Sequence, residues 1–194
     1  MTADSIDYHG RIEDDEAGLL RQAQGGDADA YGGLLSRHRR SALRVATVVL
    51  GDASDADDVV QTASERAWRA LGTVDSQRGF RSWFLRIVAN SARNHRRARW
   101  RRRRAELRVA LQPSENSIDT ADFVTADERE VVVAALNRLD AMERLVIALR
   151  HFEQLNEQEM ADVLACPPGT VKSRLSRAMS KLRAELTTEA FGDG

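Results

Sequence analysis

The 194-residue chain is predicted to be all-α, with two small helical domains joined by a flexible acidic linker and a C-terminal helix-turn-helix. Apolar residues recur at helical spacing in most segments, and no run alternates in the way a strand would. The chain contains only three prolines, and its hydrophobic content of 42% is enough for compact helical cores. A segment without helical periodicity, at about residues 112–125, separates the two sets of helices.

These observations divide the chain into five parts. The expected parts are a disordered extension (1–14), a first helical domain (15–108), a linker (109–126), a second helical domain (127–186) and a tail (187–194). The extension is expected to be disordered because it is acidic, has low hydrophobicity and shows no period.

Three helices are expected before an arginine-rich segment. Gly25-Gly26 ends the first helix and Gly51 ends the second, while Ser54 or Asp55 can cap the third. The three helices are expected at Asp15–Gln24, from Asp27 or Asp29 to Leu50, and from Asp55 to about Leu71.

The exposed side at the start of the third helix carries the acidic residues Asp55, Asp57 and Asp58 and the polar Gln61. Acidic residues there favour the positive end of the helix dipole. Simple stabilisation of the helix is therefore one reading of this cluster, and a contact surface for a partner is the other.

The segment from Phe80 to about Arg104 is arginine-rich, with 11 arginines and no acidic residue between Ser76 and Ala105. A helix there would place Trp83, Phe84, Ile87, Val88 and Ala92 on one face, and Arg86, Asn90, Arg93, Asn94, Arg97 and Arg101 on another. Guanidinium groups pair with phosphates and aromatic rings stack on bases, so the pattern favours nucleic acid. The alternative is that the aromatic residues are core and the arginines form a solvated tail.

The second domain is expected to contain four helices. The first runs from about Asp127 to Leu139, and Asp140 with Glu143 has the capping-box pattern that begins the second. The core face of that second helix comprises Met142, Leu145, Val146, Leu149 and Phe152.

The last two helices form the helix-turn-helix, with the segment Cys166-Pro167-Pro168-Gly169 as its turn. Asn156 and Glu159 form a second capping box at the start of the first of them. In the last helix the apolar positions are Val171, Leu175, Ala178, Met179 and Leu182, and the opposite side carries Thr170, Ser173, Arg174, Arg177 and Lys181, with Lys172 beside them. Such a face suits the major groove of DNA. An ordinary helical hairpin with a solvated basic face is the alternative.

Charge is strongly segregated along the chain, although its formal net charge is only −1. Residues 1–75 carry a net charge of −6, residues 76–110 carry +11, residues 111–165 carry −8 and residues 166–194 carry +2. Nucleic-acid binding depends on where the charge lies, so the overall balance does not count against it.

Several functional classes are not expected. His9, His38, His95 and His151 are scattered, and no metal-binding spacing or phosphate-binding glycine loop is present, so we expect no enzyme, metal, cofactor or small-molecule substrate. No apolar stretch of ~18 residues exists, so no membrane insertion is expected. The single cysteine, Cys166, fits a reducing compartment, and we expect a cytoplasmic protein.

Two arginine-bearing helical modules that end in Pro-Gly-Thr-Val-Lys-Ser-Arg resemble the small two-domain sigma factors of bacterial RNA polymerase, the extracytoplasmic-function group. The resemblance covers roughly residues 15–185 and implies a protein that binds core polymerase (β′ and β subunits), directs it to promoter DNA and assists DNA opening. Members of the group are often held inactive by an anti-sigma factor, which is therefore a candidate partner.

The resemblance also assigns roles to residues. It implies that the −35 element is bound by Thr170, Lys172, Ser173, Arg174, Arg177 and Lys181. It implies that the −10 element is bound by Phe80, Trp83, Arg86, Asn90, Arg93, Asn94, Arg96 and Arg97, with Asn90 at a position that helps to hold a flipped-out base. It implies that core polymerase is bound by Asp55, Asp58, Gln61 and Arg66.

Two other functions stay open on the residues alone. One is a conventional helix-turn-helix regulator whose N-terminal module senses a ligand or dimerises; such a protein would bind DNA without polymerase. The other is an interaction protein that sequesters a partner through its acidic surfaces.

Overall fold

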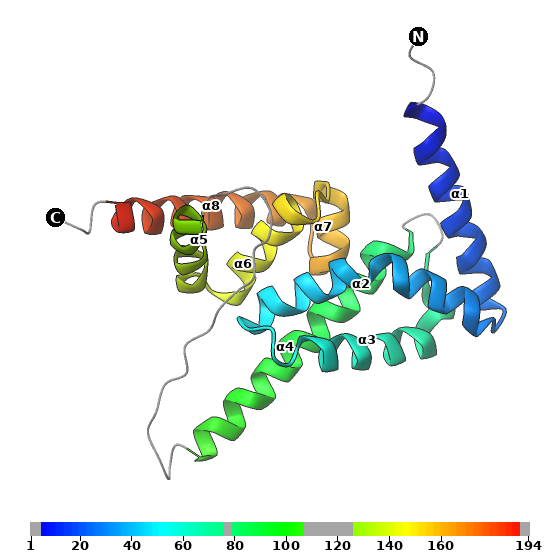
Figure 1. Ribbon diagram of the computed structural model, residues 1–194, viewed down its shortest axis with the longest axis horizontal. Coiled ribbons are helices and arrows are strands. Elements are labelled where there is room, and N and C mark those ends of the chain that lie inside the picture. Colours follow the sequence, from blue (N-terminus) through cyan, green and yellow to red (C-terminus); the bar gives the residue numbers. More distant parts are fainter. Residues whose placement is uncertain (1–4, 76–78, 107–125, 191–194) are drawn as a thin grey trace.

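The computed structural model describes residues 5–75, 79–106 and 126–190, and every element in these ranges is helical. An N-terminal module contains α1 (Ser5–Gln24), α2 (Ala28–Leu50), α3 (Ala56–Ala70), the short η1 (Leu71–Thr73) and α4 (Phe80–Glu106). A C-terminal module contains α5 (Ala126–Arg138), α6 (Ala141–Ile147), the π-helical turn η2 (Ala148–Phe152), α7 (Glu157–Leu164) and α8 (Pro168–Ala190). The predicted all-α class and helix-turn-helix are confirmed (Figure 1).

Helix starts follow the capping residues that the sequence offers. The Asp27 carboxylate accepts hydrogen bonds from the backbone N–H groups of Asp29 and Ala30, at 2.9 and 3.1 Å, and so fixes the start of α2. Both predicted capping boxes form, at Asp140 with Glu143 and at Asn156 with Glu159. Each satisfies backbone donors that the first turn of a helix would otherwise leave unpaired.

Both termini contain more helix than the sequence predicted. Helix α1 begins at Ser5, so residues 5–14, expected to be disordered, are helical, and α8 continues to Ala190 through half of the expected tail. Once a helix is nucleated, each added residue gains a hydrogen bond at little further cost, so helices extend beyond their packed part. The expected linker at 109–126 lies almost wholly outside the described residues, and α5 already begins at Ala126.

The cap predicted for the third helix is wrong in detail. Asp55 precedes α3, but its side chain makes no capping hydrogen bond. Its carboxylate instead contacts α4, where it lies 3.0 Å from both His95 Nε2 and Arg99 Nη1. A charged partner on a neighbouring helix has replaced the local cap.

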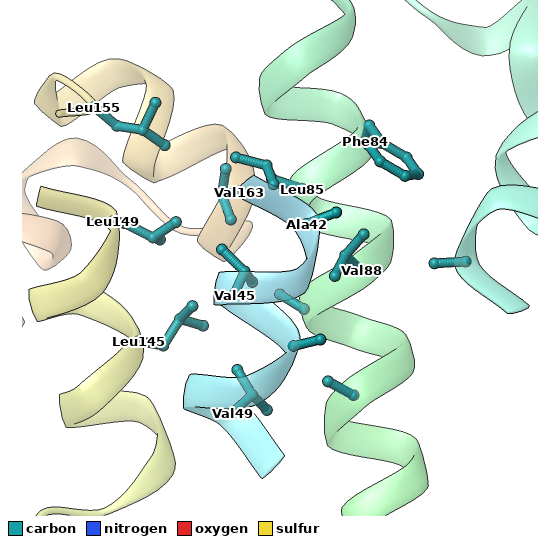
Figure 2. Packing of buried hydrophobic residues seen from close by; sticks show 14 of the residues in the cluster. Ala42, Val45, Val49, Phe84, Leu85, Val88, Leu145, Leu149, Leu155 and Val163 are labelled. Carbon is teal, nitrogen blue, oxygen red and sulfur yellow. The ribbon is translucent and has the colours of Figure 1, made fainter. Parts of the chain in front are cut away.

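The two modules pack directly against each other through a shared apolar interface. Figure 2 shows Leu145, Leu149, Leu155 and Val163 of the C-terminal module facing α2 and α4 of the N-terminal module. The residues that meet them there include Ala42, Val45, Val49, Leu85 and Val88, and all are fully buried. The two domains expected from the sequence therefore share one continuous hydrophobic core.

Candidate nucleic-acid and polymerase interfaces

Helix α4 is fixed in position by its buried side. Phe84, Val88 and Ala92 are fully buried against neighbouring helices. Further along the helix, Arg99 Nη1 lies 2.8 Å from Asp52 and 3.0 Å from Asp55. Burial raises the pKa of each of these two carboxyl groups, but hydrogen bonds from Ser54 and Arg99 to Asp52, and from Arg99 and His95 to Asp55, outweigh it and leave both pKa values lowered.

The opposite side of α4 carries most of the predicted −10 set as one stripe. Its members, at spacings of three and four residues, are Trp83, Arg86, Asn90, Arg93, Asn94 and Arg97. Arg93 Nη2 donates to Asn90 Oδ1 at 2.7 Å, so the arginine orients the amide proposed to hold a base. Burial lowers the pKa of Arg93, and the positive charges of Arg97 and Arg174 lower it further. Uncompensated positive charge on this stripe favours an anionic partner.

Two residues predicted for the −10 set do not belong to the stripe. Phe80 is fully buried and stacks on Phe84 with ring centroids 5.4 Å apart, while Tyr31 meets it edge-on at 6.3 Å. Its ring is part of the core and does not reach the surface, which corrects the prediction for Phe80. Arg96 is exposed but turns to α2, where it donates to the Val49 carbonyl at 3.3 Å.

The helix-turn-helix is built by its turn and its apolar face. Ala165 adopts a left-handed conformation with φ 52° and ends α7. Pro168 is the first residue of α8, where a backbone N–H would have no acceptor within the helix, so its absence in proline costs nothing. Val171 and Ala178 are fully buried and fix the rotation of α8. Five of the six predicted −35 residues lie in the first half of this helix, and Lys181 lies just past its midpoint.

Most of the predicted −35 side chains reach solvent. Lys172, Ser173, Arg177 and Lys181 are exposed, and Thr170 and Arg174 are half-buried. Arg174 Nη1 lies 3.7 Å from the sulfur of Cys166 in the turn. Lys181 Nζ donates to Glu143 at 2.8 Å, and this hydrogen bond raises the pKa of Lys181. Within the described residues, Lys181 is thus the only one of the six whose side chain hydrogen-bonds to a carboxylate.

The four residues predicted for polymerase binding divide into two pairs. Asp58 and Gln61 are exposed on the outer side of α3. Asp55 instead points towards α4, as described above, and Arg66 Nη1 donates to Ser91 Oγ of α4 at 3.1 Å. The outer side of α3 therefore offers Asp58 and Gln61 to a partner, whereas Asp55 and Arg66 hold α3 against α4.

The sequence did not indicate a polar cluster between the modules. Glu153 is almost completely buried and binds two arginines of the N-terminal module: Arg44 Nη1 lies 3.2 Å from Oε1, and Arg81 Nη2 lies 2.9 Å from Oε2. Arg144, also buried, donates from Nε to the Val48 carbonyl at 3.2 Å. A glutamate close to the apolar Phe152 and Leu155 is only a weak indication of a buried charge. The residues near it in the sequence do not show which arginines bind it.

Within the described residues, no three or more His, Cys, Asp or Glu side chains come together as a metal site would require. No helix in the described ranges has both the length and the apolar character to cross a bilayer.

Known proteins match both modules. The family model for Sigma-70 region 2 matches residues 34–102, and that for Sigma-70, region 4 matches residues 129–182. The RNA polymerase sigma factor NccH of Alcaligenes xylosoxydans xylosoxydans is 37% identical over 89% of this chain and 94% of its own length. The ECF RNA polymerase sigma-E factor of Escherichia coli K12 is 30% identical over 82% of this chain and 88% of its own.

A solved structure agrees with the sequence matches. CnrH, in complex with the cytosolic domain of CnrY, is 31% identical and superposes with a TM-score of 0.66 over 90% of this chain and 98% of CnrH. The helices, the two family regions and the relatives thus point to the same class of protein. The chain belongs to the sigma-70 family, and within it to the extracytoplasmic-function sigma factors of RNA polymerase.

Proposed function

We propose that the chain binds core RNA polymerase, brings it to promoters with specific −35 and −10 elements, and assists the opening of the −10 DNA. The observation that supports this proposal is that one chain has two surfaces of basic and polar side chains, the stripe on α4 and the exposed face of α8. A conventional regulator needs only the second of them. The protein would act in the cytoplasm, where polymerase and promoters are, and by binding alone.

Each face has a distinct role in this proposal. The basic and hydroxyl side chains of α8 would read base edges of the −35 element in duplex form. The α4 stripe would hold the opened strand at the −10 element, with Asn90 and Trp83 at the base and the arginines on phosphates. Unpairing and unstacking a base costs a few kcal/mol, and these contacts would offset that cost without ATP.

The proposal is tested by a pull-down of bacterial core RNA polymerase with the full chain, followed by run-off transcription from a genomic fragment library. Stoichiometric binding with new start sites is the expected result. Sequence-specific DNA binding without binding to core polymerase would contradict it and favour a conventional regulator. Loss of both activities would leave a sequestering protein.

The docking surface on α3 makes a sharper prediction. Replacing Asp58 by arginine is expected to weaken core binding at least tenfold, because it reverses an exposed charge at the centre of the proposed contact. Affinity is measured by titrating labelled protein with core polymerase. Asp29→Arg is the matched control, since Asp29 is also an exposed acid in the first turn of a helix and its loss has the same effect on the helix dipole. Equal weakening by both variants, or by neither, would contradict the assignment.

A further inference from the structure

The end of α4 continues the −10 stripe beyond the residues assigned so far. Arg97, Trp100, Arg101 and Arg104 follow one another at spacings of three, one and three residues, so they lie on the side of the helix that carries Asn90 and Arg93. In Figure 1 this end of α4 projects away from the packed helices of both modules. The stripe from Trp83 to Arg104 is ~30 Å long at the rise of an α-helix.

Trp100 is unusual for a surface side chain. It is 59% exposed, more than any other large hydrophobic residue in the described part of the chain. The guanidinium carbon of Arg104 lies 5.1 Å from the centre of its ring system, within the range of a cation–π contact. This contact holds a flat aromatic surface and a positive charge together, and no core packing accounts for either of them.

The arginines on the two sides of the C-terminal end of α4 differ in whether they form ion pairs. On the anchored side Arg99 is neutralised by Asp52 and Asp55. On the projecting side, Arg97, Arg101 and Arg104 are exposed, and no ion pair is formed by them within the described ranges. Uncompensated arginines next to an exposed ring match nucleic acid, which offers both phosphates and base faces.

We propose that Trp100, Arg101 and Arg104 form a second nucleic-acid contact, which binds the promoter strand adjoining the −10 element. Trp100 stacks on an unpaired base, and Arg101 and Arg104 neutralise phosphates beside it. This inference rests on the proposed function for the identity of the DNA, but the binding chemistry does not depend on polymerase.

The test titrates the full chain with a dye-labelled single-stranded DNA of about 20 nucleotides at several salt concentrations. Trp100→Ala should weaken binding about tenfold with little change in the salt dependence, because stacking releases no counterions. Arg101→Ala with Arg104→Ala should lower the slope of log affinity against log salt by about 1.4, which is two phosphate contacts on a single strand.

Two controls make the result specific. Trp100→Phe keeps an aromatic face and should restore most of the affinity, and Arg21→Ala removes an exposed arginine of α1 and should change neither quantity. Unchanged binding by Trp100→Ala would overturn the stacking role. Variants that bind DNA normally but lose core polymerase would show a protein contact instead. If the wild-type chain binds this DNA but not core polymerase, the proposed function fails and the second contact stands.

A separate observation concerns the interface between the modules. Helix α7 of the helix-turn-helix packs against α4, and α7 in turn packs against α8, so the −10 stripe and the −35 helix belong to one packed body. The −35 and −10 elements are by their numbering about 25 base pairs apart, or ~85 Å along B-form DNA. One molecule cannot contact both elements in the packed arrangement.

Reading both elements requires the two modules to separate. We infer that the cluster of Glu153 with Arg44 and Arg81 controls how readily they do so. Glu153 lies just after the π-helical turn η2, and both its carboxylate oxygens and its carbonyl accept hydrogen bonds from these arginines. Arg44 also donates to the Phe152 carbonyl at 2.9 Å. All of these bonds cross between modules, so all are lost on opening.

Small-angle X-ray scattering of the full chain tests this second inference. Arg44→Ala with Arg81→Ala should raise the radius of gyration by about 5 Å or more, as two tethered modules replace one packed body. The matched control is Arg39→Ala with Arg69→Ala, which removes two arginines whose partners, Asp57 and Glu65, lie within the N-terminal module.

Binding to core polymerase supplies the functional readout. The Arg44→Ala, Arg81→Ala variant should reach half-saturation at about fivefold lower concentration, because less of it is in the packed form. An unchanged radius, equal expansion of the control, or expansion without tighter core binding would each overturn the inference. If neither wild type nor variant binds core polymerase but the variant expands, the proposed function fails and the role of the interface in holding the modules together stands.

Discussion

Replacing Glu153 by alanine is expected to lower the free energy of unfolding by about 3 kcal/mol, one of the two largest effects predicted for a single substitution in this chain. The carboxylate is almost completely buried, while the side chains of Arg44 and Arg81 are 29% and 35% exposed. Removal of one member of a buried ion pair leaves its partners with unmet charge. Because both arginines can turn partly to water, the expected cost is at the lower end of the range for such pairs.

The effect is measured by urea unfolding of the full chain. Glu65→Ala is the matched control: Glu65 also pairs with an arginine, Arg69, at 3.7 Å, but both side chains are more than half exposed. Its removal should cost less than about 0.5 kcal/mol. Glu153→Gln, which keeps the shape and one carbonyl acceptor, should fall between the two. A loss for Glu153→Ala no greater than for Glu65→Ala would mean that the cluster contributes no net stability.

Features decided by neighbours in sequence could be predicted well. The two capping boxes and the glycine end of α2 depend on residues within a few positions of one another, and all form as expected. The burial of Val171 and Ala178 follows from helical spacing, which also exposes Lys172 and Arg177. The faces of α4 and α8 could therefore be derived from periodicity alone.

Features decided by contacts distant in sequence could not be predicted. Glu153 reads as part of a polar turn, and Arg44 and Arg81 read as ordinary exposed positions of amphipathic helices. Their partners are 109 and 72 residues away, and no local pattern records those distances. The same holds for Asp55, one of the two residues that could have capped α3, which instead binds Arg99 of α4.

Phe80 was misassigned for a related reason. The resemblance to sigma factors placed Phe80 in the −10 set, and its sequence neighbours do not show that α2 covers it. Tyr31 and His38 of α2 lie against its ring, with centroids 6.3 and 5.7 Å away. Trp83, one turn later and only half-buried, keeps access to solvent and stays in the proposed site.

Phe80→Ala is therefore expected to lower the free energy of unfolding by about 3–5 kcal/mol, as for other fully buried aromatic residues. Such a variant cannot separate packing from DNA contact, because any loss of DNA binding would follow from unfolding. Phe80→Leu can do so, since it fills most of the same volume at a cost of about 1.5 kcal/mol and removes the aromatic face.

The decisive comparison is between Phe80→Leu and Trp100→Ala in the single-strand titration, with urea unfolding of both variants as the measure of stability. If Phe80 only packs, its leucine variant should bind DNA within twofold of the wild type, while the Trp100 variant loses about tenfold at nearly unchanged stability, since its ring is 59% exposed. A tenfold loss for Phe80→Leu at a folded-state population like that of the wild type would return Phe80 to the DNA-binding set. It would also require the start of α4 to move away from Tyr31 when DNA binds.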